Sequence, residues 1–328
     1  MLNIRSKIIQ APMAGGITSR SLVTEVSNNG GLGSIGAGYM SANALRTLIQ
    51  DVKTDTNTPF QVNLFVIEEP KFDVKIYEKN VEQLKKLNPN CDYEKPTFSN
   101  SFYDQIEVCI EENVPIISFT FGIPSIDTLH KLKKNNIVIG QTISHPLELD
   151  LIKHLPFDFV IVQNDLAGGH KAQIKDHLPE INYNHWIKEI KQETDKIIVY
   201  SGGVHNKKQI EEYLNYVDYV QLGTPFLVTE ESGAHPLHKQ AIIDHSSDDV
   251  VVTNSFSGKA ARGLKNAFIY EMKQIDPLQY PLQNQLTKDI RNQAKKNNNI
   301  EHMSLWCGKN IDQIKLKSVE QLMNELQY

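Results

Sequence analysis

The sequence predicts an α/β fold: a TIM (β/α)8 barrel followed by a C-terminal, mostly helical lobe or lid. Eight short runs rich in β-branched and apolar residues recur along the first two thirds of the chain, separated by amphipathic stretches. This alternation is typical of a parallel sheet covered by helices. Most of the runs are continuously apolar, as in strands buried on both faces. Paired glycines follow several runs, at the strand ends where a barrel carries its active site.

The expected strands end at residue 222. An open, doubly wound sheet would produce a similar alternation, but glycine motifs after the last two strands favour the barrel. The strands are expected at residues 7–11, 32–35, 60–65, 116–120, 138–142, 159–163, 197–201 and 219–222. The helices between them are expected at residues 19–27, 43–52, 101–112, 125–135, 146–154, 183–193 and 206–215.

Two segments interrupt the alternation. Residues 68–100 are polar and contain Pro70, Pro89 and Pro96, so we expect a helix and an irregular insertion over one mouth of the barrel. The barrel count is complete by residue 235. Residues 1–235 are therefore expected to form the barrel, and residues 236–328 a helical extension that completes the substrate pocket.

The overall composition excludes several classes of protein. The net charge of −5 over 328 residues gives no electrostatic reason to bind nucleic acid or a membrane surface. Cys91, Cys109 and Cys307 are too few and too far apart for a disulfide framework or a zinc site, and no metal is expected. Because the N-terminus lacks a signal-peptide pattern and no apolar run could span a bilayer, we expect a cytoplasmic protein, either a monomer or a homodimer.

Three strand-end loops suit a flat ligand. In QAPMAGG, residues 10–16, Ala11, Pro12 and Met13 are placed to lie against a ring, and a simple βα turn is the alternative. Asn63, in an apolar strand, must find a partner on a ligand or on another strand end. In IVQNDLAGGHKA, residues 161–172, Gln163 ends a strand and is followed by Gly168, Gly169 and His170. A loop histidine can reach a ligand and exchange a proton with it.

Two further loops predict a phosphate site. YSGGVHN supplies Gly202 and Gly203, and VQLGTPF supplies Gln221, Leu222, Gly223 and Thr224. Backbone amides at such turns bind phosphate, and barrels often hold phosphate after strands seven and eight. Neither of these two loops contains a P-loop or a GxGxxG motif. Together the loops suit a flat, phosphorylated ligand with an amide edge; FMN meets each requirement, and other phosphate ligands also fit.

At these residues the chain resembles the nitronate monooxygenase family, formerly called 2-nitropropane dioxygenase. The resemblance covers nearly the whole chain. Its C-terminal segments SFSGKAARGLKN, YPLQNQLT and MSLWCG resemble those of class I members, whereas the glycine motifs also occur in other FMN barrels. One loop departs from the family pattern, with Asn164 in place of a glycine and Leu166 in place of a glutamate.

The resemblance implies a flavoprotein monooxygenase and its site residues. Asn63, Gln163, Gly168, Gly202 and residues 221–224 would contact FMN, and His170 would lie beside flavin and substrate. The implied reaction is FMN-dependent oxidation of alkyl nitronates, such as propionate 3-nitronate, by O2 through a flavin semiquinone, with a role in detoxification. His170 would orient the nitronate, or act as base if a neutral nitroalkane enters.

Alternatives remain at the level of sequence. Lys259 and Arg262 could attract an anionic substrate or lie on a solvated surface, and Tyr280 could close the pocket or be buried in the lobe. A second function is NAD(P)H-dependent FMN reduction of quinones or enoyl thioesters. A third, of another class, is a non-redox phosphate-binding isomerase or lyase, or a ligand-binding barrel.

Overall fold

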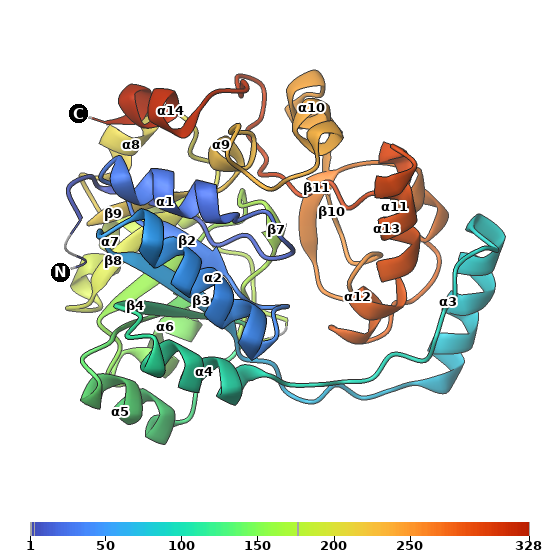
Figure 1. Ribbon diagram of the computed structural model, residues 1–328, viewed down its shortest axis with the longest axis horizontal. Coiled ribbons are helices and arrows are strands. Elements are labelled where there is room, and N and C mark those ends of the chain that lie inside the picture. Colours follow the sequence, from blue (N-terminus) through green and yellow to red (C-terminus); the bar gives the residue numbers. More distant parts are fainter. Residues whose placement is uncertain (1, 3, 176, 328) are drawn as a thin grey trace.

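The structure, a computed structural model, describes residues 2, 4–175 and 177–327. A barrel and a smaller lobe lie side by side (Figure 1). The barrel sheet has eight parallel strands in the order β1-β9-β8-β6-β5-β4-β3-β2. A bridge between Ile9 and Leu32 closes it, with the Gln10 amide 3.0 Å from the Leu32 carbonyl. The strands are β1 (Ile8–Gln10), β2 (Gly33–Gly36), β3 (Phe60–Phe65), β4 (Ile116–Thr120), β5 (Val138–Ile143), β6 (Phe159–Gln163), β8 (Ile197–Ser201) and β9 (Tyr219–Leu222).

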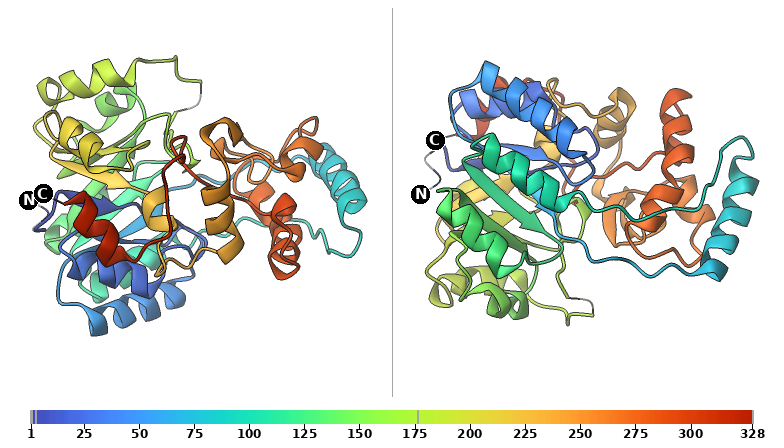
Figure 2. Two further views of the ribbon diagram at one scale, coloured as in Figure 1. Left: turned by 90° about the horizontal axis from the view of Figure 1, so that it is seen from above. Right: turned by 60° about the horizontal axis from the view of Figure 1, so that its bottom comes forward.

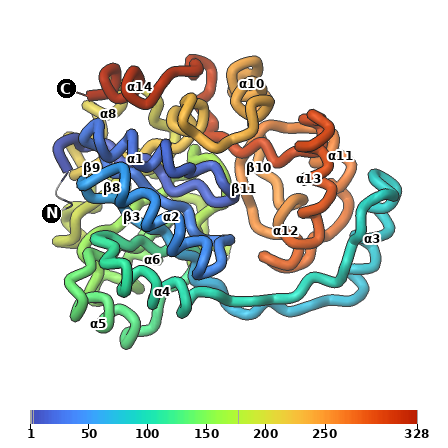
Figure 3. Tube along the Cα trace, viewed as in Figure 1, coloured from blue at the N-terminus to red at the C-terminus, as the bar shows by residue number. Residues whose placement is uncertain are grey.

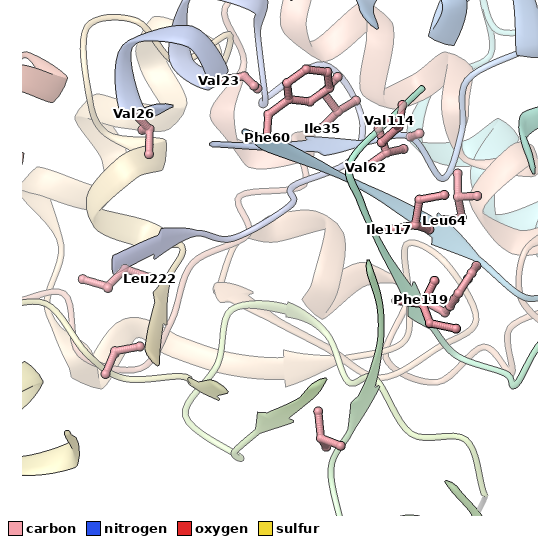
Figure 4. Close-up of a cluster of buried hydrophobic side chains, with 14 of the residues drawn as sticks. Val23, Val26, Ile35, Phe60, Val62, Leu64, Val114, Ile117, Phe119 and Leu222 are labelled. Atoms are coloured by element: carbon pink, nitrogen blue, oxygen red, sulfur yellow. The ribbon is translucent and has the colours of Figure 1, made fainter. Parts of the chain in front are cut away.

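All eight expected strands are confirmed, because each apolar run is buried on both faces. One set of side chains fills the barrel interior, including Ile9, Phe159 and Tyr219. A larger set packs between the strands and the surrounding helices, and Figure 4 shows part of it. Position 140 needs a glycine for a steric reason, because a Cβ there would come within 2.2 Å of the Phe159 ring.

The helices around the barrel also follow the expected order. Serine side chains begin several of them; Ser19, for example, accepts from the Leu22 amide and Ser125 from the Thr128 amide. The barrel helices are α1 (Arg20–Asn28), α2 (Ala42–Asp55), α4 (Phe102–Glu111), α5 (Ile126–Lys134), α6 (Pro146–Ile152), α7 (Tyr183–Glu189), α8 (Lys207–Tyr213) and α9 (Thr224–Leu227). Within the described residues no helix is long and apolar enough to cross a membrane.

The last helix of the chain belongs to the barrel, although residues 236–328 were expected to form the lobe. Helix α9 has only four residues and is too short to cover its side of the sheet. Helix α14 (Val319–Leu326) fills that side, in contact with α1, α8 and α9 (Figures 1 and 3). Its Val319, Leu322, Met323 and Leu326 join the main barrel core.

The lobe combines the C-terminal segment with the insertion after β3. Its elements are α3 (Val74–Leu87), α10 (Pro236–Asp244), β10 (Val250–Thr253), β11 (Ala261–Leu264), α11 (Ala267–Glu271), α12 (Leu282–Leu286) and α13 (Lys288–Lys296). Two extended connections carry α3 away from the barrel (Figure 2). Leu84 packs with Phe268 and Leu282, and the Asn80 amide donates to the Asp276 carbonyl at 2.8 Å. The insertion therefore contains the expected helix but packs on the lobe instead of over a barrel mouth.

A short strand links barrel and lobe. Strand β7 (Gly169–His170), in the loop after β6, pairs antiparallel with β11 and completes the sheet β10-β11-β7. His170 lies opposite Ala261, and the Lys171 amide donates to the Ala260 carbonyl at 2.8 Å. A barrel loop is thus fixed by backbone hydrogen bonds to the lobe.

We expect Met323→Ala to lower the free energy of unfolding by about 2–5 kcal/mol, since it opens a cavity between α14 and α1. Met323 is fully buried, and its Cε would lie 3.0 Å from a Cβ added at Gly31. Urea denaturation measures the change. Asn324→Ala, on the exposed side of the same helix, should shift it by less than about 0.5 kcal/mol; equal effects of both variants would contradict the packing of α14 on the barrel.

Candidate functional site

His170 lies at the centre of a group of aromatic side chains where the barrel meets the lobe, named here the aromatic pocket. Its imidazole is 6.1 Å from the Phe121 ring, 5.4 Å from the Tyr280 ring and 5.6 Å from the Trp306 ring, measured between centroids. Its Nε2 is 2.8 Å from the Ser257 hydroxyl. The predicted histidine therefore faces side chains from both halves of the molecule.

Phe121 has an unusual backbone conformation at the end of β4. Its φ of 80° lies in the left-handed region, which bulky residues rarely adopt and which is found disproportionately at functional sites. This conformation places the ring against Phe65, with centroids 4.6 Å apart, and against Tyr280 at 5.3 Å. The result is an apolar wall opposite His170.

The environment keeps His170 neutral. Burial, followed by the positive charges of Lys259 and Arg291, lowers the pKa of His170 from 6.5 to about 3. The imidazole is therefore unprotonated at neutral pH and can accept a proton or donate one hydrogen bond.

Two cations border this pocket. The Lys259 ammonium lies 5.0 Å above the Phe121 ring and 3.3 Å from the Gln173 carbonyl. The Arg291 guanidinium donates only to neutral oxygens: the Thr287 carbonyl, and the carbonyl and side chain of Asn284. Among the residues that the structure describes, no carboxylate pairs with Arg291. Sequence reasoning identified Lys259 and missed Arg291, which follows the YPLQNQLT motif by one helical turn.

A pair of tyrosines joins the barrel to the lobe. The Tyr39 and Tyr280 hydroxyls are 3.0 Å apart, and Tyr280 is only 9% exposed. Burial raises the pKa of Tyr280 well above 10, so its hydroxyl stays protonated. The sequence left open whether Tyr280 closes the pocket or is buried in the lobe. In the structure its ring lies beside His170 and is also buried. Tyr39, on the loop after β2, carried no signal in the sequence.

Asn63 and Gln163 form hydrogen bonds within the protein. The Asn63 amide donates to the Ser118 carbonyl, and to the Ser118 and Thr120 hydroxyls at 3.0 Å each. The Gln163 amide nitrogen donates to the His170 carbonyl at 3.2 Å, and its oxygen accepts from the Ala172 amide at 2.8 Å. Of the two partners expected for Asn63, the structure shows the neighbouring strand end. Gln163 holds the loop that carries His170.

The loops after β8 and β9 present free backbone amides. Within the described chain, the N–H groups of Gly202, Gly203 and Gly223 donate to no protein acceptor. Gly202 has φ of 121°, and a Cβ there would lie 2.0 Å from the Asn164 side chain. The two strands are adjacent in the sheet, so these amides gather at one place. The start of α8, by contrast, is already capped by Asn206.

Other predicted contact residues lie around the same place. Ala11 donates its amide to the Leu222 carbonyl, and its Cβ is the nearest atom, at 3.7 Å, to a Cβ added at Gly223. The Gln221 amide donates to Ser201, whereas its buried Oε1 has no partner. The Thr224 hydroxyl accepts from the Gly308 amide at 2.8 Å. The structure therefore brings the ends of strands β1, β8 and β9 together.

Pro12 and Met13 follow Ala11, and Met13 packs against both the barrel core and a lobe cluster. Gly168 lies against the chain at Cys307, since a Cβ would come within 2.5 Å of the Cys307 carbonyl carbon. Gly169 has φ of 70° and open space around it. These residues line the junction between barrel and lobe, where His170 is placed.

Arg262 forms hydrogen bonds to the barrel loop that precedes His170. Its guanidinium donates twice to the Asp165 carbonyl, at 3.1 and 2.5 Å. Asn164 and Leu166, the two departures from the family pattern, shape the same loop. The Asn164 side chain donates to the Tyr200 hydroxyl and accepts from the Leu166 amide, while Leu166 packs at Gly203.

Comparison with known proteins agrees with this geometry. The profile of the family described as nitronate monooxygenase matches residues 1–328. The chain belongs to the nitronate monooxygenase family. A Bacillus subtilis (strain 168) protein named "Probable nitronate monooxygenase" is 35% identical, covering 99% of this chain and 96% of its own. A Staphylococcus haemolyticus (strain JCSC1435) protein of the same name is 38% identical, covering 99% and 94%.

Solved structures extend the comparison. Nitroalkane oxidase from Streptomyces ansochromogenes superposes with a TM-score of 0.92 at 29% identity, covering 98% of this chain and 95% of that one. FabK from Thermotoga maritima reaches 0.78 at 24% identity, covering 99% and 92%, which shows a shared fold only. Membership of the nitronate monooxygenase family makes this chain an oxidoreductase that acts on nitronates.

We expect Gln163→Leu to lower the free energy of unfolding of the flavin-free protein by about 1–3 kcal/mol, because it leaves the Ala172 amide without its acceptor. Gln163→Glu keeps an acceptor for the Ala172 amide and should therefore lose less stability. Urea denaturation without added flavin measures both. If neither variant changed stability, Gln163 would not hold the His170 loop.

Proposed function

We propose that the protein catalyses FMN-dependent oxidation of alkyl nitronates by O2. The observation that carries this proposal is a neutral His170 in an aromatic pocket bordered by the cations Lys259 and Arg291. An anionic substrate of modest size suits such a pocket, because its charge offsets the Arg291 guanidinium, which burial has deprived of water.

The strand-end residues fit FMN. The free amides of Gly202, Gly203 and Gly223 match a phosphate, which binds well to clustered backbone N–H groups. The unpartnered Gln221 Oε1 can accept from an N–H on the polar edge of a flavin. FMN, when bound, supplies the redox chemistry by taking electrons from the nitronate and passing them to O2.

The protein's own residues bind and orient the substrate. Lys259 and Arg291 attract the nitronate, and the rings of Phe121, Tyr280 and Trp306 exclude water from it. His170 lies between these groups and is unprotonated. It can therefore remove the acidic C–H proton from a neutral nitroalkane, converting it to a nitronate in place.

The direct test of this function is oxygen consumption by the FMN-loaded protein with propionate 3-nitronate alone. We expect rapid uptake that needs no NADH. With a neutral nitroalkane, His170→Asn should lower turnover by about 10²-fold or more while FMN stays bound, since proton removal is lost.

Two results would contradict the proposal. A protein that takes up no FMN, as judged by its absorption spectrum after reconstitution, would be a non-redox barrel. A protein that consumes no oxygen with nitronates but whose flavin is bleached by NADH in the presence of a quinone would be a reductase.

We expect Arg291 to attract the negative charge of the substrate. Arg291→Gln should raise KM for propionate 3-nitronate by about tenfold, equivalent to about 1.4 kcal/mol of lost attraction. KM for a neutral nitroalkane should change much less, and Arg291→Lys should retain most of the affinity. Steady-state kinetics with both substrates measures the difference; an equal rise for both would show that Arg291 only supports the lobe.

A further inference from the structure

Ser257 forms an unusually complete set of hydrogen bonds around one hydroxyl. It is 1% exposed, in the segment between β10 and β11. Its Oγ lies 2.8 Å from His170 Nε2, 3.1 Å from the Lys259 carbonyl oxygen and 3.3 Å from the Lys259 amide nitrogen. Gly258, next in the chain, has φ of 84°, and a Cβ there would lie 2.1 Å from the Leu278 carbonyl, so the turn is fixed in place.

The chemistry of these neighbours determines where the protons lie. A carbonyl oxygen only accepts, so the single hydroxyl proton of Ser257 points to the Lys259 carbonyl. A backbone amide only donates, so it gives its proton to Ser257. His170 Nε2 can act either way, and the role left for it is that of donor. The neutral imidazole therefore carries its proton on Nε2.

The other ring nitrogen then has a free lone pair. His145 Nε2 and His205 Nδ1 are buried without a hydrogen-bond partner. His170 Nδ1 differs from them in not being fully buried. Nor does it form a hydrogen bond with any residue in the described ranges. Nδ1 is therefore exposed, and its lone pair points away from the Nε2 side of the ring that faces Ser257.

We propose that Ser257 is a positioning residue that holds His170 as the Nε2–H tautomer, so that Nδ1 is the atom that takes the substrate proton. This deepens the proposed function and rests on it. In the step, the C–H bond of a neutral nitroalkane breaks, its electron pair stays on the substrate as the nitronate, and the proton forms a bond to Nδ1. The imidazolium keeps its Nε2–H bond to Ser257 until the proton passes to solvent.

The surrounding charges are consistent with this step. Lys259 and Arg291 disfavour an imidazolium at His170. The nitronate is formed together with the imidazolium, and its negative charge lies among the same cations and offsets them. A preformed nitronate has no such proton to lose, so its oxidation does not depend on the tautomer.

The experiment compares Ser257→Ala with Ser257→Thr, which restores the hydroxyl, and with the matched control Ser255→Ala. Ser255 is a buried serine two residues away whose hydroxyl accepts from Thr253. We expect Ser257→Ala to lower kcat/KM for nitroethane by about 10- to 100-fold. Its kcat/KM for ethyl nitronate should stay within about twofold of the value for the unmodified protein. Ser257→Thr and Ser255→Ala should behave like the unmodified protein.

An independent readout is the 15N chemical shifts of the His170 ring in the FMN-loaded protein, assigned by comparison with His170→Asn. We expect a protonated Nε2 and an unprotonated Nδ1, and a mixture of tautomers in Ser257→Ala. A protonated Nδ1 in the unmodified protein, or equal losses with nitroethane and ethyl nitronate in Ser257→Ala, would overturn the proposal. If neither substrate drove oxygen uptake, the proposed function would fail, whereas the shifts would still decide the tautomer.

Discussion

The antiparallel pairing of β7 with β11 is the interaction on which the site depends. Without it, the loop after β6 would be a long, glycine-containing connection with no fixed place for His170. The pairing sets Ala261 opposite His170 and Arg262 opposite Gly169. Gln163 from the barrel and Arg262 from the lobe then fix the two ends of the same loop. The histidine is therefore positioned by two bodies of the fold at once.

This arrangement explains the electrostatics of the pocket. The barrel contributes Phe121 and free amides, whereas the lobe contributes Tyr280 and Trp306 together with Ser257, Lys259 and Arg291. Burying the Arg291 guanidinium, which pairs with no carboxylate among the described residues, is costly, and burial lowers its pKa. In the proposed function an anionic substrate offsets this cost, which would link the choice of substrate to the way the lobe is attached.

Much of this fold could be predicted from local sequence. The barrel strands were recognisable because strands buried on both faces are apolar throughout, and the strand-end glycines marked the side that carries the site. Helix α14 was harder to place, because its apolar face fits any core equally well. Its position depends on the shortness of α9, which only the folded chain reveals. The insertion helix α3 posed the same difficulty.

Site residues could be predicted where they lie together in one loop of the sequence. They could not be predicted where their roles come from contacts between segments far apart in the chain. His170 and the glycines stood out beside one another in sequence. Tyr39, Phe121, Ser257 and Arg291 come from four distant segments, and their roles arise from contacts across the pocket. Gln163 was recognisable as a strand-end polar residue, but its hydrogen bonds to His170 and Ala172 were not.

Hydrogen exchange at the Lys171 amide, which donates to the Ala260 carbonyl, tests the central interaction most directly. Because β7 is a strand of the lobe sheet, this amide should exchange about as slowly as the hydrogen-bonded amides of β11, in the protein with FMN bound. Exchange at the rate of an unprotected loop, with the β11 and barrel amides still protected, would show that the lobe does not hold the His170 loop.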